Sequence, residues 1–424
     1  MSLKVVLVGA GSAVFARPFI QDLFLSALED VELRLVEPQG ERLRQVEVLV
    51  QRLAEAFPRR GVRARPMDLG EALPGSDVVV LAADVGGDTA LRQEYQVALG
   101  HGVDQTIGDT LGPGGLMKFL RNAPLVDAIG ERFEGRLVLN YTNPLSPLTA
   151  LLWAWDRPAL GLCHSVPQTA KTLAGYLGLS PEEVSYKAAG VNHLSWLVEL
   201  KREEEDLYPR LRALGQGPLW WKDPVRFELL RLFGLFPTES SAHVSEYVPY
   251  FRKTPEAFRA YFAPGTPGSS GYYAQTHSRL AEESLRALGE APPPGGWSGE
   301  WAVPILEGLA MGRRVSLYAT VPNRDHVPQL LPGPVEVPVV LEGTSWRAER
   351  VSLPPGPAAL SRRSQEVHLL YLEGYLRKDP GLLLQGLALD PLTGAVLDLR
   401  GVEALFRDLV RTQAPLLPAF LAGI

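Results

Sequence analysis

Residues 5–12 read Val-Val-Leu-Val-Gly-Ala-Gly-Ser, and this stretch decides the fold of the N-terminal part of the chain. The four apolar residues indicate a buried strand, and glycines follow it at once. Gly9 allows a tight turn, and Gly11 lets the backbone approach a pyrophosphate at the start of the next helix. Val14 stands in place of the third glycine of the usual pattern. The stretch predicts a strand–turn–helix unit that binds a dinucleotide, and a plain glycine turn is the alternative.

A second strand is predicted at residues 31–36, and it ends in Glu37. An acidic residue at this place accepts the ribose hydroxyls of a bound dinucleotide. Its negative charge would repel a phosphate on the ribose, so the pattern favours NAD over the phosphorylated cofactor.

Apolar strands alternate with helix-like segments through the first 150 residues. Strands are predicted at residues 5–8, 31–36, 76–83 and 136–140, and helices at residues 18–28 and 41–56. Buried strands that alternate with helices are typical of β-α-β units and of a doubly wound parallel sheet. The sequence therefore predicts an α/β fold with a Rossmann-like, NAD-binding domain over residues 1–190.

The pattern changes beyond about residue 190, where strands, helices and loops rich in Pro, Gly and Ser are mixed. Strands are predicted at residues 191–200 and 315–321. Helices are predicted at residues 224–233, 279–288, 361–378 and 401–417. We expect an α+β domain over residues 191–424 that carries substrate and metal and packs closely on the first domain.

The composition narrows the class of protein. The 424 residues are 46% apolar, which is enough for a large folded core. A net charge of -6 argues against a nucleic-acid partner, because a phosphate backbone needs a basic surface. No apolar run approaches the roughly 20 residues of a membrane-spanning helix. Cys163 is the sole cysteine, so an intramolecular disulfide is excluded and a reducing compartment is indicated. We expect a cytoplasmic protein.

Two short segments carry potential metal ligands. Residues 161–165 read Gly-Leu-Cys-His-Ser, and residues 190–193 read Gly-Val-Asn-His. The thiolate of Cys163 and the imidazole of His193 are suitable ligands for a divalent metal. Two ligands would leave positions open for substrate oxygens. A sole cysteine is more often a small buried apolar residue, and that alternative stands from spacing alone.

Two further segments carry polar groups in loops. Asp109 lies in Gln-Thr-Ile-Gly-Asp-Thr-Leu-Gly-Pro-Gly-Gly at residues 105–115, where the glycines indicate an unusual backbone conformation. It is a candidate for chemistry, with a turn-capping role as the alternative. Asn140 and Asn143 follow a predicted strand, and their amides suit a ribose or a sugar hydroxyl, with an Asn-Pro turn as the alternative.

A third polar segment, residues 238–253, reads Thr-Glu-Ser-Ser-Ala-His-Val-Ser-Glu-Tyr-Val-Pro-Tyr-Phe-Arg-Lys. It contains candidate groups for titration or substrate binding, namely Glu246, Tyr247 and Tyr250.

The order of these segments resembles family 4 of the glycoside hydrolases, from residue 1 to the C-terminus. The branch with melibiase-type α-galactosidases is the most similar, with α-glucosidases and α-glucuronidases as relatives. The resemblance implies an NAD- and metal-dependent glycosidase, with Mn²⁺ or another divalent ion. It also implies a reaction sequence: NAD oxidises the sugar at C3, a base removes the C2 proton, the glycosidic oxygen leaves C1, and water adds.

The resemblance also implies residue roles. The metal ligands would be Cys163 and His193, and substrate would contact Asn143 and Asn192. The cofactor would contact Gly9, Gly11, Ser12, Glu37 and Asn140. The base would be Tyr247, with Tyr250 in reserve, and Asp109 would raise its basicity. His164 is the candidate general acid, because it stands where phospho-glycosidase relatives have an aspartate.

The same resemblance bears on substrate and assembly. Leu91 stands where the phospho-specific branch tends to carry an arginine, which indicates an unphosphorylated sugar. An α-galactoside is the leading expectation, and a homodimer or homotetramer is expected because relatives form both.

Two other functions compete with this one. The N-terminal half also resembles lactate and malate dehydrogenases, so an NAD-dependent 2-hydroxy-acid dehydrogenase is one alternative. The Cys163–His193 pair and roughly 100 extra residues count against it. A non-catalytic NAD-binding sensor is the other, and the presence of Cys163, His193 and Asp109 counts against that.

Overall fold

The computed structural model describes residues 2–12, 15–58, 61–276, 279, 283 and 296–424. The apolar run at the N-terminus forms β1 (Leu3–Val8), which lies in the middle of a parallel sheet. β1 pairs with β2 (Asp30–Val36) on one side and with β4 (Val78–Leu81) on the other. Its side chains are almost wholly buried, as expected for a strand covered by helices on both faces.

The parallel strands follow the order β3-β2-β1-β4-β5-β6, with β3 (Gly61–Pro66), β5 (Leu137–Asn140) and β6 (Ala159–Gly161). This is the strand order of dinucleotide-binding folds, whose ligands bind at the carboxyl ends of the strands where the order reverses. The strands predicted at residues 5–8, 31–36, 76–83 and 136–140 are confirmed. The sequence pattern does not predict β3, which buries only Val62, or β6, which has three residues.

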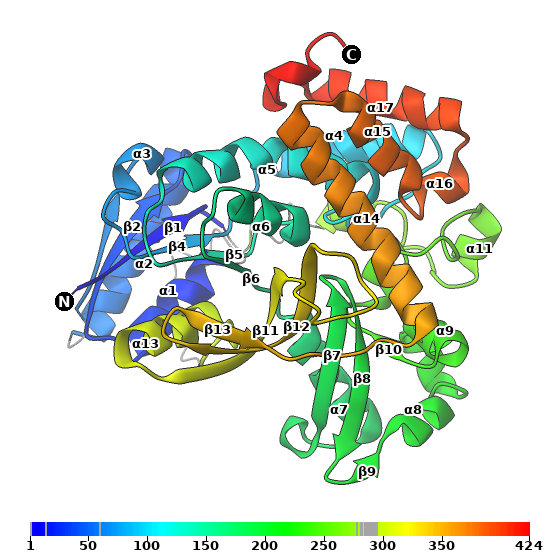
Figure 1. Cartoon of the computed structure of the whole chain (residues 1–424), viewed down its shortest axis with the longest axis horizontal. Coiled ribbons are helices and arrows are strands. Elements are labelled where there is room, and N and C mark those ends of the chain that lie inside the picture. The colour runs from blue at the N-terminus through cyan, green and yellow to red at the C-terminus, as the bar shows by residue number, and fades with distance from the viewer. Residues whose placement is uncertain (1, 13–14, 59–60, 277–278, 280–282, 284–295) are drawn as a thin grey trace.

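Helices cover both faces of these strands, and Figure 1 shows α1 and α5 on opposite sides of them. The helices predicted at residues 18–28 and 41–56 are confirmed as α1 (Ala16–Leu25) and α2 (Gly40–Ala56). The others in this part are α3 (Leu69–Ala72), α4 (Gly87–Gly100), α5 (Gly112–Arg132), α6 (Leu145–Ala154) and α7 (Ser165–Leu177).

The sheet continues beyond β6 with antiparallel strands. The hairpin of β11 (Arg314–Pro322) and β12 (Pro334–Glu342) comes first, followed by β7 (Ser185–Val191), β8 (Leu194–Arg202) and β10 (Phe236–Pro237). Two short strands, β9 (Glu205–Asp206) and β13 (Ser345–Ala348), pair with β8 and β12. In the described part of the chain these strands make one 13-stranded sheet. The predicted fold class, Rossmann-like α/β with further α and β elements, is confirmed.

One predicted strand needs a correction. The pattern predicts a single strand at residues 191–200, but β7 ends at Val191 and β8 begins at Leu194. Asn192 and His193 form the turn between them, and His193 has a positive φ of 68°. The segment resembles one strand in the sequence because the apolar residues Val191 and Leu194 flank the turn, and the turn itself is buried. The strand predicted at residues 315–321 is confirmed as β11.

The β11–β12 hairpin separates the two strands that precede the candidate metal ligands. β11 pairs with β6 through Thr320 and Gly161, and β12 pairs with β7 through Glu336 and Gly190. A Cβ atom on Gly161 would lie 2.8 Å from Thr149 Oγ1 and 2.9 Å from the Cβ of Thr320. The close approach at this seam therefore requires glycine.

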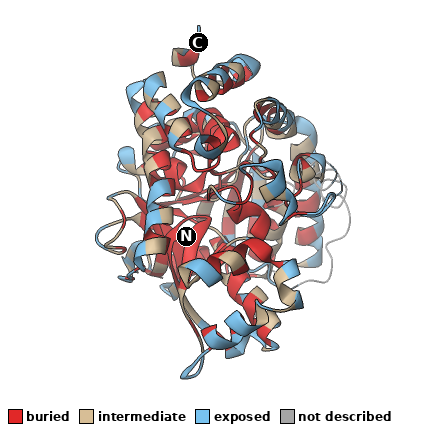
Figure 2. Cartoon of the chain, turned by 90° about the vertical axis from the view of Figure 1, so that its right-hand side faces the viewer, coloured by how far each residue is buried: buried red, intermediate tan, exposed pale blue. Residues whose placement is uncertain are grey.

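Helices complete the second half: α8 (Tyr208–Leu214), α9 (Pro224–Phe233), α10 (Ser241–Val244), α11 (Pro255–Arg259), α13 (Ala302–Met311), α14 (Pro355–Arg377), α15 (Pro380–Leu389), α16 (Thr393–Val396) and α17 (Leu399–Gln413). The predictions at residues 224–233, 361–378 and 401–417 are confirmed, and that at 279–288 lies almost wholly outside the described residues. Figure 2 shows buried residues gathered on the sheet and on the helix faces turned toward it. None of the described helices has the length and apolar character needed to cross a bilayer.

Candidate active site

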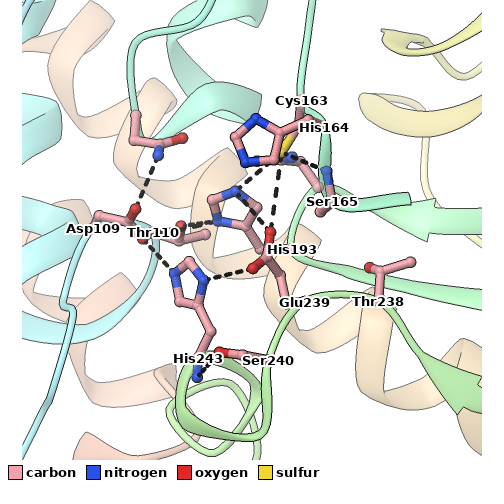
Figure 3. A network of polar contacts seen from close by, with 12 residues as sticks. Asp109, Thr110, Cys163, His164, Ser165, His193, Thr238, Glu239, Ser240 and His243 are labelled. Carbon is pink, nitrogen blue, oxygen red and sulfur yellow. Dashed lines mark hydrogen bonds and ion pairs between the residues drawn. The ribbon is translucent and has the colours of Figure 1, made fainter. Parts of the chain in front are cut away.

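Five polar side chains converge from four separate loops, and we call them the polar cluster: Asp109, Cys163, His193, Glu239 and His243 (Figure 3). Asp109 lies between α4 and α5, Cys163 follows β6, and His193 lies in the β7–β8 turn. Glu239 follows β10, and His243 lies in α10. The sheet positions the cluster, because three of these loops leave the ends of its strands.

Cys163, His193 and Glu239 offer donor atoms to a shared point. The Cys163 Sγ atom lies 3.5 Å from His193 Nε2, which lies 3.5 Å from Glu239 Oε1. A thiol, an imidazole and a carboxylate within 4.8 Å of one another are a donor set that suits a divalent transition metal. The residues present at this point therefore fit the metal that the sequence predicts.

The ring of His193 is fixed by its other nitrogen. The Thr110 Oγ1 atom lies 2.7 Å from His193 Nδ1, which leaves Nε2 facing Cys163. Burial lowers the pKa of His193, so its neutral form, the one that binds metals, is favoured. Burial and the neighbouring Glu239 raise the pKa of the Cys163 thiol well above its usual value. A cation would be needed to hold Cys163 as the thiolate.

His243 bridges two carboxylates. Its Nε2 atom lies 2.8 Å from Asp109 Oδ1, and its Nδ1 atom lies 2.9 Å from Glu239 Oε2. Burial opposes the charge on His243, but Asp109 and Glu239 raise its pKa well above the usual value. Burial would raise the pKa of Glu239, yet His193 and His243 lower it to about 2. The cluster therefore holds a charged imidazole between two ionised carboxylates.

Tyr247 reaches this cluster, and Tyr250 does not. The Tyr247 side chain is buried, and its hydroxyl donates a hydrogen bond of 3.4 Å to Asp109 Oδ1. Its ring stacks on His193 with 6.3 Å between ring centroids. Tyr250 is 40% exposed and packs on Phe233.

Glu246 anchors the loop that carries Asp109. Its buried carboxylate accepts hydrogen bonds from the backbone N–H groups of Thr106, Ile107 and Gly108, at 2.5, 2.7 and 2.9 Å. Glu246 thus has a structural contact, which fixes the backbone next to Asp109, and its role in titration or substrate binding stays a prediction.

Replacing Glu246 with glutamine is expected to lower the free energy of unfolding by about 2–3 kcal/mol, because an NH₂ group would face buried N–H donors. Urea unfolding followed by circular dichroism measures the change. Glu256→Gln is the matched control, since that side chain is exposed on α11 and its unfolding midpoint should stay unchanged. Equal midpoints for the two variants would contradict the anchoring role.

The other predicted residues lie at different depths around the cluster. Asn143 Nδ2 donates to Asp109 Oδ2 at 2.9 Å, which places it at the cluster. His164 is largely exposed and lies 3.2 Å from Glu300, whose hydrogen bond raises the pKa of the imidazole. Asn192 is buried and donates to Glu336. Asn140 is fully buried, and its amide bonds to Thr149 and to the backbone of its own turn.

The glycine turn after β1 has the geometry of a dinucleotide cradle. Gly9 has a φ of 83°, and a Cβ atom there would lie 2.4 Å from the backbone oxygen of Ala82. The Gly11 N–H donates to Glu37 Oε2 at 2.9 Å, and a Cβ on Gly11 would displace that carboxylate. The Ser12 hydroxyl accepts from the N–H of Phe15 at the start of α1. Backbone and carboxylate therefore meet where pyrophosphate and ribose would bind.

Sequence reasoning singled out residues 238–253 but missed Glu239 and His243 as members of the cluster. A carboxylate and an imidazole four residues apart can meet on one side of a helical turn, and that spacing was the available signal. The positive φ of Glu239, 71°, is not visible from sequence.

Comparison with known proteins places both halves of the chain in one family. Residues 4–179 match the family described as "Family 4 glycosyl hydrolase", and residues 188–393 match its C-terminal domain. An α-galactosidase of Bacillus subtilis (strain 168) is 29% identical, covering 98% of this chain and 99% of its own. An α-galactosidase of Rhizobium meliloti (strain 1021) is 29% identical, with 100% and 91% coverage. An α-galacturonidase of B. subtilis is 26% identical, with 96% and 97% coverage.

Solved structures share the fold. A 6-phospho-α-glucosidase from gut microorganisms, in complex with NAD and Mn²⁺, superposes with a TM-score of 0.80 at 18% identity, covering 99% of both chains. A lactate dehydrogenase from Eimeria maxima superposes with a TM-score of 0.50 at 15% identity, covering 90% of this chain and 98% of its own. At these identities the likeness concerns the fold alone.

Proposed function

Because this chain belongs to family 4 of the glycosyl hydrolases, we propose that it hydrolyses α-galactosides with bound NAD and a divalent cation, Mn²⁺ in the first place. The observation that carries the proposal is the polar cluster, in which Cys163 and His193 lie together and which the buried Tyr247 contacts. Three of its members, Cys163, His193 and Glu239, lie in loops that follow strands of the sheet, which contains a dinucleotide-binding part.

We assign the metal to Cys163 and His193, and the cofactor to the glycine turn with Glu37. When bound, NAD would supply a hydride acceptor for the sugar, and the cation would supply a Lewis acid for the sugar oxygens. Gly9, Gly11 and Ser12 would shape the cradle. Asn140 would act indirectly, by holding the turn that positions Asn143.

Tyr247 would remove the proton from sugar C2 through its hydroxyl oxygen. Burial and the neighbouring Asp109 raise the pKa of Tyr247, so the hydroxyl is protonated until a cation lies beside it. Asp109 accepts the hydrogen bond of that hydroxyl and so increases its basicity. His164 would protonate the departing glycosidic oxygen, and Asn143 and Asn192 would contact the sugar or position its neighbours.

Three observations favour a neutral, unphosphorylated galactoside. The relatives named α-galactosidases are the more similar ones, ahead of the α-galacturonidase. A uronate needs an available cation, but the cations described beside the cluster have carboxylate partners: Lys118 lies 3.0 Å from Asp84, and Arg226 lies 2.8 Å from Asp223. Leu91, where phospho-specific relatives are expected to have an arginine, is buried.

We also propose two features of the whole chain. We divide the chain into an NAD-binding part, residues 1–190, and a substrate and metal part, residues 191–424; the change to antiparallel pairing after β6 supports it, with the antiparallel β7 at the boundary. A homodimer or homotetramer is proposed for the assembly, and sedimentation measurements against the 46.3 kDa chain mass would test it.

The test is hydrolysis of p-nitrophenyl α-galactoside, α-glucoside, α-galacturonide and α-glucuronide, with and without NAD and Mn²⁺, in the presence of a thiol reductant. We expect cleavage to need both additions and to be fastest for the galactoside. Cleavage without NAD or metal would contradict the mechanism, and a faster galacturonide would contradict the sugar assignment. Net NADH accumulation on a hydroxy acid would favour a dehydrogenase, and NAD binding without turnover a sensor.

A further inference from the structure

The two carboxylate oxygens of Glu239 face different members of the polar cluster. Its Oε2 atom is held 2.9 Å from His243 Nδ1. Its Oε1 atom faces the opposite way, 3.5 Å from His193 Nε2 and 4.0 Å from Cys163 Sγ. His243 thus orients the carboxylate so that one oxygen remains directed at the two assigned metal ligands.

The three facing atoms have the spacing of ligands around one cation. Their separations are 3.5 Å, 3.5 Å and 4.0 Å. A point in their plane at equal distance from all three lies about 2.1 Å from each, within the range of metal–ligand bonds, about 2.0–2.3 Å. A second set of possible donors, Asp109, His193 and His243, fits less well, because His243 Nε2 lies 2.8 Å from Asp109 Oδ1. Both ring nitrogens of His243 are thus taken up by hydrogen bonds to carboxylates, the other to Glu239 Oε2 at 2.9 Å, which leaves no nitrogen free for a cation.

The backbone of Glu239 is held in a costly conformation by buried contacts. Glu239 has a φ of 71°, in the left-handed region that residues other than glycine rarely adopt. The Arg226 guanidinium donates to the Glu239 carbonyl oxygen and is itself paired with Asp223. The Thr238 N–H donates to the carbonyl oxygen of Ser195, in β8. Such strain persists where the surrounding structure fixes a side chain for use.

We propose that Glu239 is a third protein ligand of the metal, with His243 as its positioning residue. This inference rests on the proposed function, because it presupposes that Cys163 and His193 bind the cation. Three protein ligands, two of them anionic, hold a divalent cation without help from sugar hydroxyls. The Glu239 carboxylate is partly open to solvent, so positions remain for the substrate. The protein should therefore bind Mn²⁺ tightly before any sugar arrives.

The experiment is titration of the full chain with Mn²⁺ by calorimetry and electron paramagnetic resonance, in the absence of sugar. Glu239→Gln keeps the shape of the side chain but removes the anionic ligand. We expect its Mn²⁺ affinity to fall by about 100-fold or more, since even residues that merely orient a ligand contribute about 10–100-fold. With Co²⁺, the thiolate charge-transfer band of Cys163 should persist while the ligand-field bands change.

Glu336→Gln is the matched control. Glu336 is a buried carboxylate, hydrogen-bonded to Ser195 and Asn192, that acts on Cys163 electrostatically but belongs to neither group of candidate metal donors. We expect its Mn²⁺ affinity to change by less than about 5-fold, as for one screened neighbouring charge. An equal loss in both variants would overturn ligation in favour of general electrostatics.

Other outcomes are equally decisive. Unchanged affinity in Glu239→Gln, with slower turnover, would overturn the proposal and make Glu239 a group that acts on substrate. If the glutamine variant does not fold, Glu239→Asp retains the charge but withdraws it by about one C–C bond of 1.5 Å. A folded aspartate variant with wild-type affinity would also overturn it. Absence of Mn²⁺ binding by the wild-type chain would instead refute the proposed metal-dependent function itself.

Discussion

Replacing Cys163 with serine is expected to lower metal-dependent hydrolysis by at least about 100-fold, since residues that only orient a metal ligand already contribute about 10–100-fold. A serine hydroxyl is a poor ligand beside His193, because it does not ionise near neutral pH. The measurement is kcat/KM for the preferred p-nitrophenyl glycoside as a function of Mn²⁺ concentration.

The Cys163→Ser variant should fold normally. The thiol is only partly buried and accepts one backbone hydrogen bond, from Ser165, which a hydroxyl can accept equally. Its unfolding midpoint and NAD affinity are therefore expected to match the wild type, which separates loss of the metal from loss of the fold. Full metal-dependent activity in this variant would refute the assignment of Cys163 as a ligand.

Replacing Tyr247 with phenylalanine is expected to lower kcat by about 10²–10⁴-fold, the usual contribution of a general base. The Tyr247 phenol is buried, and its hydroxyl donates a long hydrogen bond of 3.4 Å to Asp109 and also interacts with the Thr110 side chain. The ring would still pack on His193 and His243, so the fold and Mn²⁺ binding should be retained. Exchange of the sugar C2 hydrogen with deuterated water, followed by NMR, should disappear together with turnover.

Tyr250→Phe provides the matched control for this variant. Tyr250 is exposed, belongs to the same loop, and packs on Phe233 rather than on the cluster. Its kcat should stay within about two-fold of wild type, as is usual for surface changes remote from a site. The reverse outcome, with Tyr250 essential and Tyr247 dispensable, would show that the loop rearranges before catalysis.

Much of the fold could be predicted because periodicity and glycine placement are local signals. β1, α1, β2 and α2 follow from apolar spacing alone, and the acidic residue after β2 completes the pattern. β3 escapes prediction because Arg63 and Arg65 interrupt its apolar pattern at the edge of the sheet. The turn at Asn192 and His193 escapes because apolar residues flank it and the segment resembles one strand. Such features depend on tertiary contacts, which one sequence does not display.

The candidate site, like the fold, could be predicted only where the signal is local in the sequence. Cys163, His193, Asp109 and Tyr247 could be selected by resemblance, and the structure brings these four side chains together. Their mutual positions, and the place of His243 between two carboxylates, depend on segments 30 to 134 residues apart along the chain. Choosing between Tyr247 and Tyr250 needed burial, because both are tyrosines of one short loop.

The β11–β12 hairpin has a consequence for how the chain is made. Cys163 and His193 are synthesised and leave the ribosome long before the hairpin. The hairpin spans residues 314–342 and pairs with β6 and β7. Until it emerges, β6 offers an unpaired edge to any neighbouring nascent chain. Chaperone protection during translation should therefore matter most in this interval. Polypeptides truncated between residues 200 and 310 should collect as insoluble material, although they contain the entire parallel sheet.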